Sequence, residues 1–286
     1  MQAVDLHHAL GHDPIVRFDG LTKWQDPPRD GQCIRDLWFW PSRCEPCGLD
    51  PSRFTCQDPQ MQTALIGKRV LVTQATEFMG PALCDVFIEQ GAEVMASTGE
   101  LSDAAAVDRV VREAGRIDVL LVNLAVKAPS TPAPEVTDTE WKRVFAALVD
   151  PLPWLIRAAA PEMIARRAGR ILVMGSASAL RGMRRASTYS AARGAQLAYV
   201  QAVGVELAPH NVQVNAIAQN FVDNPTYFPA EVQANPKFQE RLAREVPLGR
   251  LVSAREDAQF AAYLCSDAAA CFVGQVFPVC GGWAPR

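Results

Sequence analysis

Short apolar runs alternate with longer amphipathic stretches along the chain from Gly67 onward. The apolar runs are rich in valine, leucine and isoleucine, which is typical of buried strands, and the longer stretches carry apolar residues at helical spacing. Strands are expected at residues 68–73, 93–97, 117–123, 171–174, 211–217 and 274–279, and helices at 78–90, 102–115, 138–167 (one or two helices), 188–208 and 255–266. Such repeated strand–helix units predict an α/β fold with a Rossmann-like, doubly wound parallel sheet.

Residues 1–65 differ from the rest of the chain. They hold seven of the 21 prolines and four of the eight cysteines, without sustained periodicity. Cys44 and Cys47 form one C-x-x-C pair, but a structural zinc site more often combines two close pairs, so we expect no metal. This irregular extension is either poorly ordered or upstream of the native product, since Met61 would also be a natural start. The Rossmann-like catalytic domain is assigned to residues 66–286.

Charge and hydropathy argue against two classes of partner. The net charge of −3 and pI near 5.9 give no reason to expect nucleic acid or another polyanion. No segment has the ~18 uninterrupted apolar residues of a membrane span, and the N-terminus lacks the apolar region of a signal peptide. We therefore expect a cytoplasmic protein without a membrane partner.

The strand–helix unit at residues 170–193 carries a chemically coherent group of side chains. Its strand ends at Ser176, and Tyr189 and Arg193 stand four residues apart on the next helix, with Cβ atoms roughly 6 Å apart. A phenol is a poor base at neutral pH, but a cation within ~4–6 Å lowers its pKa by roughly 1–3 units. Arginine suits this role because it stays protonated at any working pH. We expect Ser176 to hold a substrate oxygen while Tyr189 removes its proton.

The same three residues carry a resemblance to a known family. Ser176, twelve residues, Tyr189, three residues and then a basic residue resembles the catalytic pattern of the short-chain dehydrogenase/reductase superfamily. That pattern has lysine in the last place, where it holds the nicotinamide ribose, whereas this chain has Arg193. A Ser–Tyr–Arg group with this spacing resembles the halohydrin (haloalcohol) dehalogenases, a cofactor-free branch of the superfamily.

The turn after the first expected strand also departs from the superfamily pattern, at positions that contact the nucleotide. A dinucleotide-binding fold has glycines there so that the backbone can approach the pyrophosphate. The superfamily pattern is T-G-x-x-x-G-x-G, but here Gln74 and Phe78 replace the first two glycines. Stretches that contact the cofactor in relatives also differ, at residues 96–98, 123–126 and 218–222. A reductase that lost its function at random would lose its catalytic residues as easily, yet Ser176 and Tyr189 are kept.

The resemblance implies a reaction and a site. A vicinal halohydrin would bind through its hydroxyl to Ser176 and Tyr189, and its alkoxide would displace the halide to give an epoxide; small anions would open epoxides in reverse. The resemblance also implies that no nucleotide cofactor takes part. The resemblance assigns the halide pocket to Phe78, Asn220, Phe221 and Val222, and the substrate pocket to Val126 and Ser178. Relatives are usually tetramers, so a homotetramer is expected.

Two other functions remain open. One is an NAD(P)-dependent oxidoreductase with a degenerate cofactor turn, against which Arg193, Gln74 and Phe78 count. The other is a catalytically silent Rossmann domain that binds a ligand, against which the intact Ser176, Tyr189 and Arg193 count. A hydrolytic dehalogenase is not expected, because the chain has no G-x-S-x-G nucleophile elbow.

Overall fold

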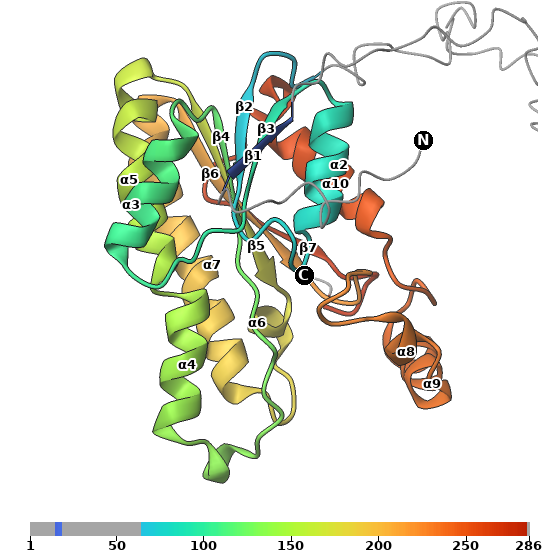
Figure 1. The fold of residues 1–286 in the computed structure, drawn as a ribbon. Helices are drawn as coiled ribbons and strands as arrows, with labels where there is room; N and C mark the ends of the chain where they lie inside the picture. Colours follow the sequence, from blue (N-terminus) through green and yellow to red (C-terminus); the bar gives the residue numbers. More distant parts are fainter. Residues whose placement is uncertain (1–14, 19–63, 285–286) are drawn as a thin grey trace, which may run out of the picture.

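The structure is a computed structural model that describes residues 15–18 and 64–284. A sheet in the order β1-β3-β2-β4-β5-β6-β7 forms its centre, and all neighbouring strands from β3 to β7 are parallel (Figure 1). The strands are β1 (Ile15–Phe18), β2 (Arg69–Val72), β3 (Glu93–Ser97), β4 (Val119–Asn123), β5 (Gly169–Ser176), β6 (Val212–Gln219) and β7 (Val276–Val279). The strand order reverses between β2 and β4, which makes the sheet doubly wound. The predicted fold class is confirmed.

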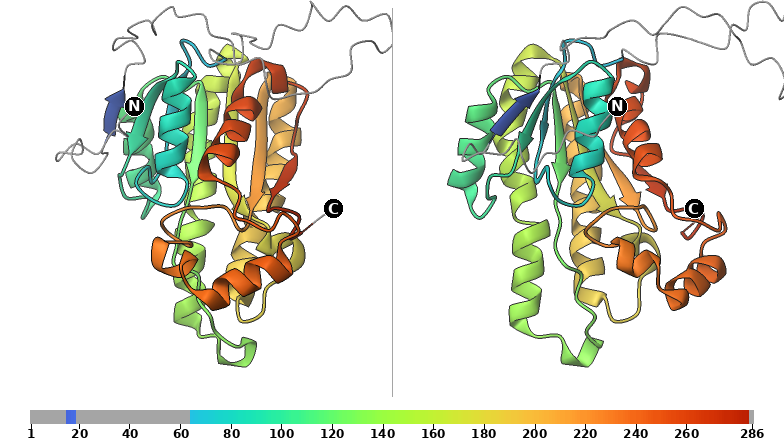
Figure 2. Two further views of the ribbon diagram at one scale, coloured as in Figure 1. Left: turned by 90° about the vertical axis from the view of Figure 1, so that its right-hand side faces the viewer. Right: turned by 45° about the vertical axis from the view of Figure 1, so that its right-hand side comes forward.

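Helices cover both faces of this sheet, with α3, α4, α5 and α7 on one side and α2 and α10 on the other (Figures 1 and 2). They are α2 (Gly80–Glu89), α3 (Ala104–Ala114), α4 (Asp138–Leu148), α5 (Pro151–Arg166), α6 (Ser178–Arg181), α7 (Ser187–Leu207), α8 (Ala230–Gln233), α9 (Pro236–Glu245) and α10 (Ala254–Cys265), with 3-10 turns at Ala133–Glu135, Ala208–His210 and Asp267–Ala269. Successive strand residues point to opposite faces. Leu71 of β2 therefore joins the core on the side of α3, α4, α5 and α7, while Val70 and Val72 join the core under α2 and α10.

One strand differs from the expectation of an irregular N-terminal extension. Residues 15–18 form β1, which pairs antiparallel with β3 and extends the sheet by one strand. The outer strand of a parallel sheet leaves a row of N–H and C=O groups unpaired, and β1 satisfies them along β3. Ile15 is buried there in the same core as Leu71. The cysteines at 33, 44, 47 and 56 lie outside the described residues; within the described ranges no three His, Cys, Asp or Glu side chains gather as a metal site.

The stretch expected to form one or two helices at residues 138–167 forms two. Pro151 starts α5 at a position whose backbone N–H needs no helical partner, so the break falls just before it. By length and composition alone, Asp138–Arg166 would pass as a membrane-crossing helix, but 44% of that window is buried within the protein. α5 packs on α3 and against β4 and β5, so its apolar residues are core residues of the domain.

The long excursion between β6 and α10 folds over the carboxyl ends of the parallel strands. It contains α8 and α9, which Figure 2 shows beyond the ends of β5 and β6. Ligands of doubly wound sheets bind at this edge, outside the carboxyl ends of the strands. The expected catalytic and halide-binding residues all lie on elements that meet here.

Candidate active site

The predicted pair on α7 is in contact. Arg193 lies one turn after Tyr189, and its Nε donates a hydrogen bond to the Tyr189 hydroxyl at 3.0 Å. The guanidinium carbon is also 5.1 Å from the centre of the Tyr189 ring. Arg193 is fully buried and Tyr189 is 7% exposed, so the phenol meets a permanent cation away from bulk water.

All five N–H groups of Arg193 have acceptors. Apart from Tyr189, these are the Met174 carbonyl at 3.1 Å, Gln196 Oε1 at 3.0 Å, the Leu124 carbonyl at 3.1 Å and the Tyr227 hydroxyl at 3.3 Å. Burial lowers the pKa of Arg193, but the two neighbouring phenols raise it by more, so the guanidinium stays charged. A lysine has only three donors. Arginine is therefore the residue that this set of acceptors requires.

Ser176, the last residue of β5, lines the same cleft as Tyr189. Its Oγ lies 2.9 Å from the Oγ of Ser178 and accepts a hydrogen bond from the Ser178 N–H at 3.2 Å. When Ser178 donates, the proton of the Ser176 hydroxyl is available to a substrate oxygen. Ser178 itself is buried behind Ser176 and does not line the cleft, so its place is beneath the predicted substrate pocket.

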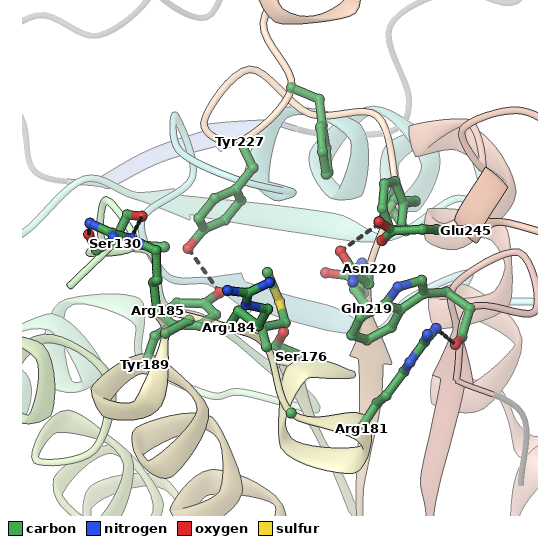
Figure 3. Close-up of a pocket in the computed structure, with 18 of the residues that line it drawn as sticks. Ser130, Ser176, Arg181, Arg184, Arg185, Tyr189, Gln219, Asn220, Tyr227 and Glu245 are labelled. Carbon is green, nitrogen blue, oxygen red and sulfur yellow. Dashed lines mark hydrogen bonds between the residues drawn. The ribbon is translucent and has the colours of Figure 1, made fainter. Parts of the chain in front are cut away.

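A second tyrosine, Tyr227, completes the site and was not predicted. Its hydroxyl accepts a hydrogen bond from Tyr189 at 3.2 Å (Figure 3). It donates one to the Val126 carbonyl at 2.9 Å. Val126, expected in the substrate pocket, does not line the cleft and contributes this backbone acceptor. Tyr227 is 38 residues from Tyr189 in the chain, inside the irregular excursion, so no spacing rule pointed to it.

The turn after β2 keeps a glycine-like backbone although it carries side chains. Gln74 and Phe78 have φ values of 45° and 52°, in the left-handed region that favours glycine. Each such residue costs about 1–3 kcal/mol, and strain of this kind gathers at functional sites. The Gln74 Oε1 accepts a hydrogen bond from the Ala125 N–H at 2.7 Å. The Phe78 ring is buried, 5.3 Å from the Tyr227 ring and 5.5 Å from the Arg193 guanidinium.

This turn does not fit a dinucleotide. In dinucleotide-binding proteins its N–H groups and the N-terminus of the next helix hold the pyrophosphate. Here five of its N–H groups already donate within the protein: Ala75 to the Ser97 carbonyl, Glu77 to the Gln74 carbonyl, Phe78 to Thr226 Oγ1, Met79 to Asn123 Oδ1 and Gly80 to the Glu77 carbonyl. The glycine positions are filled by the Gln74 and Phe78 side chains, and Arg193 has no free donor for a ribose.

The loop after β6 brings Asn220, Phe221 and Val222 to the cleft on the side of Ser176, because β5 and β6 are adjacent and Ser176 pairs with Gln219. The Oδ1 of Asn220 accepts a hydrogen bond from the Phe221 N–H at 2.9 Å, which fixes the orientation of the amide. The Nδ2 of Asn220 is buried and has no partner, so it is a donor available to a bound group. Phe221 has φ 52° and is another residue other than glycine with a left-handed backbone conformation. Val222 is buried beside it.

The cleft has a volume of about 700 Å³ and a basic rim. Phe78, Ser176, Tyr189, Asn220, Phe221, Val222 and Tyr227 line it. Four arginines and one glutamate also line it, a formal charge of +3 in a chain of net charge −3: Arg181, Arg184, Arg185, Arg241 and Glu245. Within 219–228 the sequence has no basic residue, so this charge comes from the end of α6, the loop between α6 and α7, and α9. The tertiary structure alone assembles it.

A buried carboxyl lies behind the cleft. The Gln219 Nε2 donates to the Asp257 Oδ2, while the Gln219 Oε1 and the Asp257 Oδ1 are buried without a partner. Burial raises the pKa of Asp257 to about 7, and the Gln219 hydrogen bond offsets only part of that shift. A protonated Asp257 has the donor that the two unpartnered oxygens lack.

The doubly wound parallel sheet carries a serine at the end of β5 and a tyrosine–arginine pair on α7, together at its carboxyl edge. The chain belongs to the short-chain dehydrogenase/reductase superfamily, because the model of a family described as "Enoyl-(Acyl carrier protein) reductase" matches residues 67–284.

Similar proteins fall into two groups. The chain is 32% identical to "Cis-4-hydroxycyclohexanecarboxylate dehydrogenase" of Sinomonas cyclohexanicum over 65% of this chain and 73% of that protein, and 32% identical to "Galactitol 2-dehydrogenase (L-tagatose-forming)" of Cereibacter sphaeroides over 77% and 96%. A solved structure described as "Dehalogenation enzyme" is 30% identical, with a TM-score of 0.73, covering 77% of this chain and all of that one.

Proposed function

We propose that this chain is a halohydrin dehalogenase, which converts vicinal halohydrins into epoxides with release of halide and uses no nucleotide. The observation that carries the proposal is the buried Tyr189–Arg193 pair beside a cofactor turn that protein side chains fill. The similarity to the structure described as "Dehalogenation enzyme" agrees with it. The partner is then a small halohydrin or epoxide together with a halide ion, and we keep the homotetramer as part of the proposal.

The reaction follows from the groups at the end of β5 and on α7. Ser176 Oγ donates to the substrate hydroxyl, and the ionised Tyr189 takes the hydroxyl proton. The alkoxide attacks the neighbouring carbon from the side opposite the halogen, so one C–O bond forms and the C–halogen bond breaks with its electron pair on the halide. Tyr189 then returns its proton to solvent. Alkoxide and leaving group belong to one molecule, so positioning supplies much of the rate.

The halide leaves toward the loop after β6. The unpartnered Asn220 Nδ2 is a donor that faces no competing acceptor, and aromatic ring edges, such as those of Phe78 and Phe221, carry positive potential. The basic rim attracts anions to the cleft from solution without a cation inside the halide loop. This arrangement suits an ion that is bound weakly and released, and the same route admits azide or cyanide in the reverse reaction.

An NAD(P)-dependent oxidoreductase is the second candidate, and the names of the similar proteins favour it. It needs the serine and tyrosine that this chain has, but also a pyrophosphate site in the turn after β2. The side chains of Gln74 and Phe78 and the internally bonded N–H groups of that turn count against this candidate.

The deciding experiment is a halide-release assay on the purified full chain. The protein is mixed with 1,3-dibromo-2-propanol without nucleotide, and bromide and proton release are followed together. We expect both in equal amounts, abolished in Tyr189→Phe and unchanged in the control Tyr263→Phe, which alters a tyrosine exposed on α10. NADH or NADPH binding without bromide release would overturn the proposal and favour the oxidoreductase.

A further inference from the structure

We propose that Tyr227 is a positioning residue for the base: it shares the Arg193 guanidinium with Tyr189 and donates a hydrogen bond to Tyr189 when that phenol ionises. The proposal rests on the proposed function for its catalytic meaning. The hydrogen bonds among the two phenols and the guanidinium do not depend on which reaction the site catalyses.

The contacts of the two hydroxyls carry the inference. Arg193 Nε donates to Tyr189 and Arg193 Nη2 donates to Tyr227, so one cation serves both phenols. With both phenols protonated, Tyr189 donates to Tyr227 at 3.2 Å, and Tyr227 donates to the Val126 carbonyl at 2.9 Å. When Tyr189 loses its proton, its oxygen can only accept. Rotation of the Tyr227 hydroxyl then turns its proton from Val126 to Tyr189, and the short contact between the two oxygens is kept.

Which phenol ionises is set by their surroundings. Burial raises the pKa of Tyr227 above its ordinary value by more than the Arg193 charge lowers it. Tyr227 therefore stays protonated over the working range and remains a donor. Tyr189 receives the hydrogen bond from Arg193 Nε and also lines the cleft beside Ser176, where a substrate hydroxyl reaches it.

Tyr227 is held in place independently of Tyr189. Its backbone N–H donates to the Asn224 Oδ1 at 2.9 Å, and the Oγ1 of its neighbour Thr226 accepts from the Phe78 N–H at 2.7 Å. Its ring meets the Phe78 ring edge-on at 90°. Phe78 therefore has a role beyond filling the glycine position of the turn, because it supports the second phenol.

Other charged groups around Tyr189 set the background. Arg193 comes from its own helix, and the cleft wall adds Arg181, Arg184, Arg185, Arg241 and Glu245. These rim groups are unaltered in every variant below, so a change in the titration of Tyr189 on removal of the Tyr227 hydroxyl reports the hydrogen bond between the two phenols.

The test is a spectrophotometric titration of phenolate, which needs no substrate. The chain has only four tyrosines. The difference between the titrations of wild type and Tyr189→Phe gives the Tyr189 signal with the Tyr227 hydroxyl present. The difference between Tyr227→Phe and the double variant gives the Tyr189 signal without that hydroxyl. We expect loss of the Tyr227 hydroxyl to move the Tyr189 midpoint up by about one pH unit, or about tenfold less phenolate at a fixed pH below it. Tyr263→Phe is the matched control and leaves the Tyr189 midpoint where it is.

Two further measurements keep the inference open to refutation. Asn224→Ala loosens Tyr227 without removing its hydroxyl and should move the midpoint in the same direction by less. In halide release, Tyr227→Phe should shift the acidic limb of the kcat/KM–pH profile upward by the same amount and leave the alkaline plateau. An unmoved Tyr189 midpoint in Tyr227→Phe overturns the inference even if halide is released. A moved midpoint without halide release supports the inference and overturns the proposed function.

Discussion

Replacing Arg193 with lysine, the residue of the superfamily pattern, should damage the protein rather than restore a reductase. The fully buried guanidinium satisfies five acceptors, and a lysine ammonium has three donors, so at least two acceptors lose their partner. A buried acceptor left unsatisfied costs about 1–3 kcal/mol. The loss should therefore be about 2–6 kcal/mol in the free energy of unfolding, an estimate that sums two such terms. Burial also disfavours a charged ammonium, so Tyr189 loses part of its cation.

Urea unfolding followed by circular dichroism measures this loss. The matched control is Arg109→Lys, because Arg109 is exposed on α3 and the same exchange there should change stability by no more than about 0.5 kcal/mol. In the same samples, Arg193→Lys should lose most halide release and should not gain NADH binding, since Gln74 and Phe78 still fill the turn. A loss of stability as small as that of the control would refute the count of acceptors.

Three further predictions concern packing, the halide and a buried acid. Gly80→Ala places a Cβ 2.3 Å from the Ala75 carbonyl oxygen and should lower stability by about 3 kcal/mol. Gly194→Ala places a Cβ 4.0 Å from the Ala179 Cβ of α6, an ordinary contact, and should raise stability by up to about 1 kcal/mol. Thermal melting of both variants tests this, and equal effects would contradict the reasoning. Asn220→Ala removes the unpartnered donor and should weaken bromide as a product inhibitor about tenfold, while an unchanged inhibition constant would place the halide elsewhere. Asp257 has its pKa raised to about 7 by burial, so the native state binds a proton that the unfolded chain has released, and stability falls as pH rises from about 4 to about 7. Asp257→Asn should remove this dependence, and above that pH window its free energy of unfolding should exceed that of wild type by up to about 4 kcal/mol. Urea unfolding of both proteins near pH 5 and pH 9 measures this. Parallel pH curves for the two proteins would rule out the prediction.

The strands and helices of the domain were predictable because their signals are local. Apolar runs and helical spacing located the parallel strands and the long helices to within a few residues. The contact between Tyr189 and Arg193 was predictable for the same reason, since residues four apart on a helix are neighbours. β1 was not predicted, because a four-residue strand forms only when a sheet edge is there to pair with it.

The sequence by itself determined the doubly wound sheet, the serine and tyrosine at its carboxyl edge, and the loss of glycines from the cofactor turn. Only the tertiary structure decided that Gln74 and Phe78 keep a left-handed backbone, that five acceptors converge on Arg193, and that Tyr227 joins the site. These features depend on segments up to 148 residues apart, as in the hydrogen bond from Phe78 to Thr226. Periodicity reports how a segment meets its own neighbours, whereas the partners of a buried polar group are set by how distant segments pack.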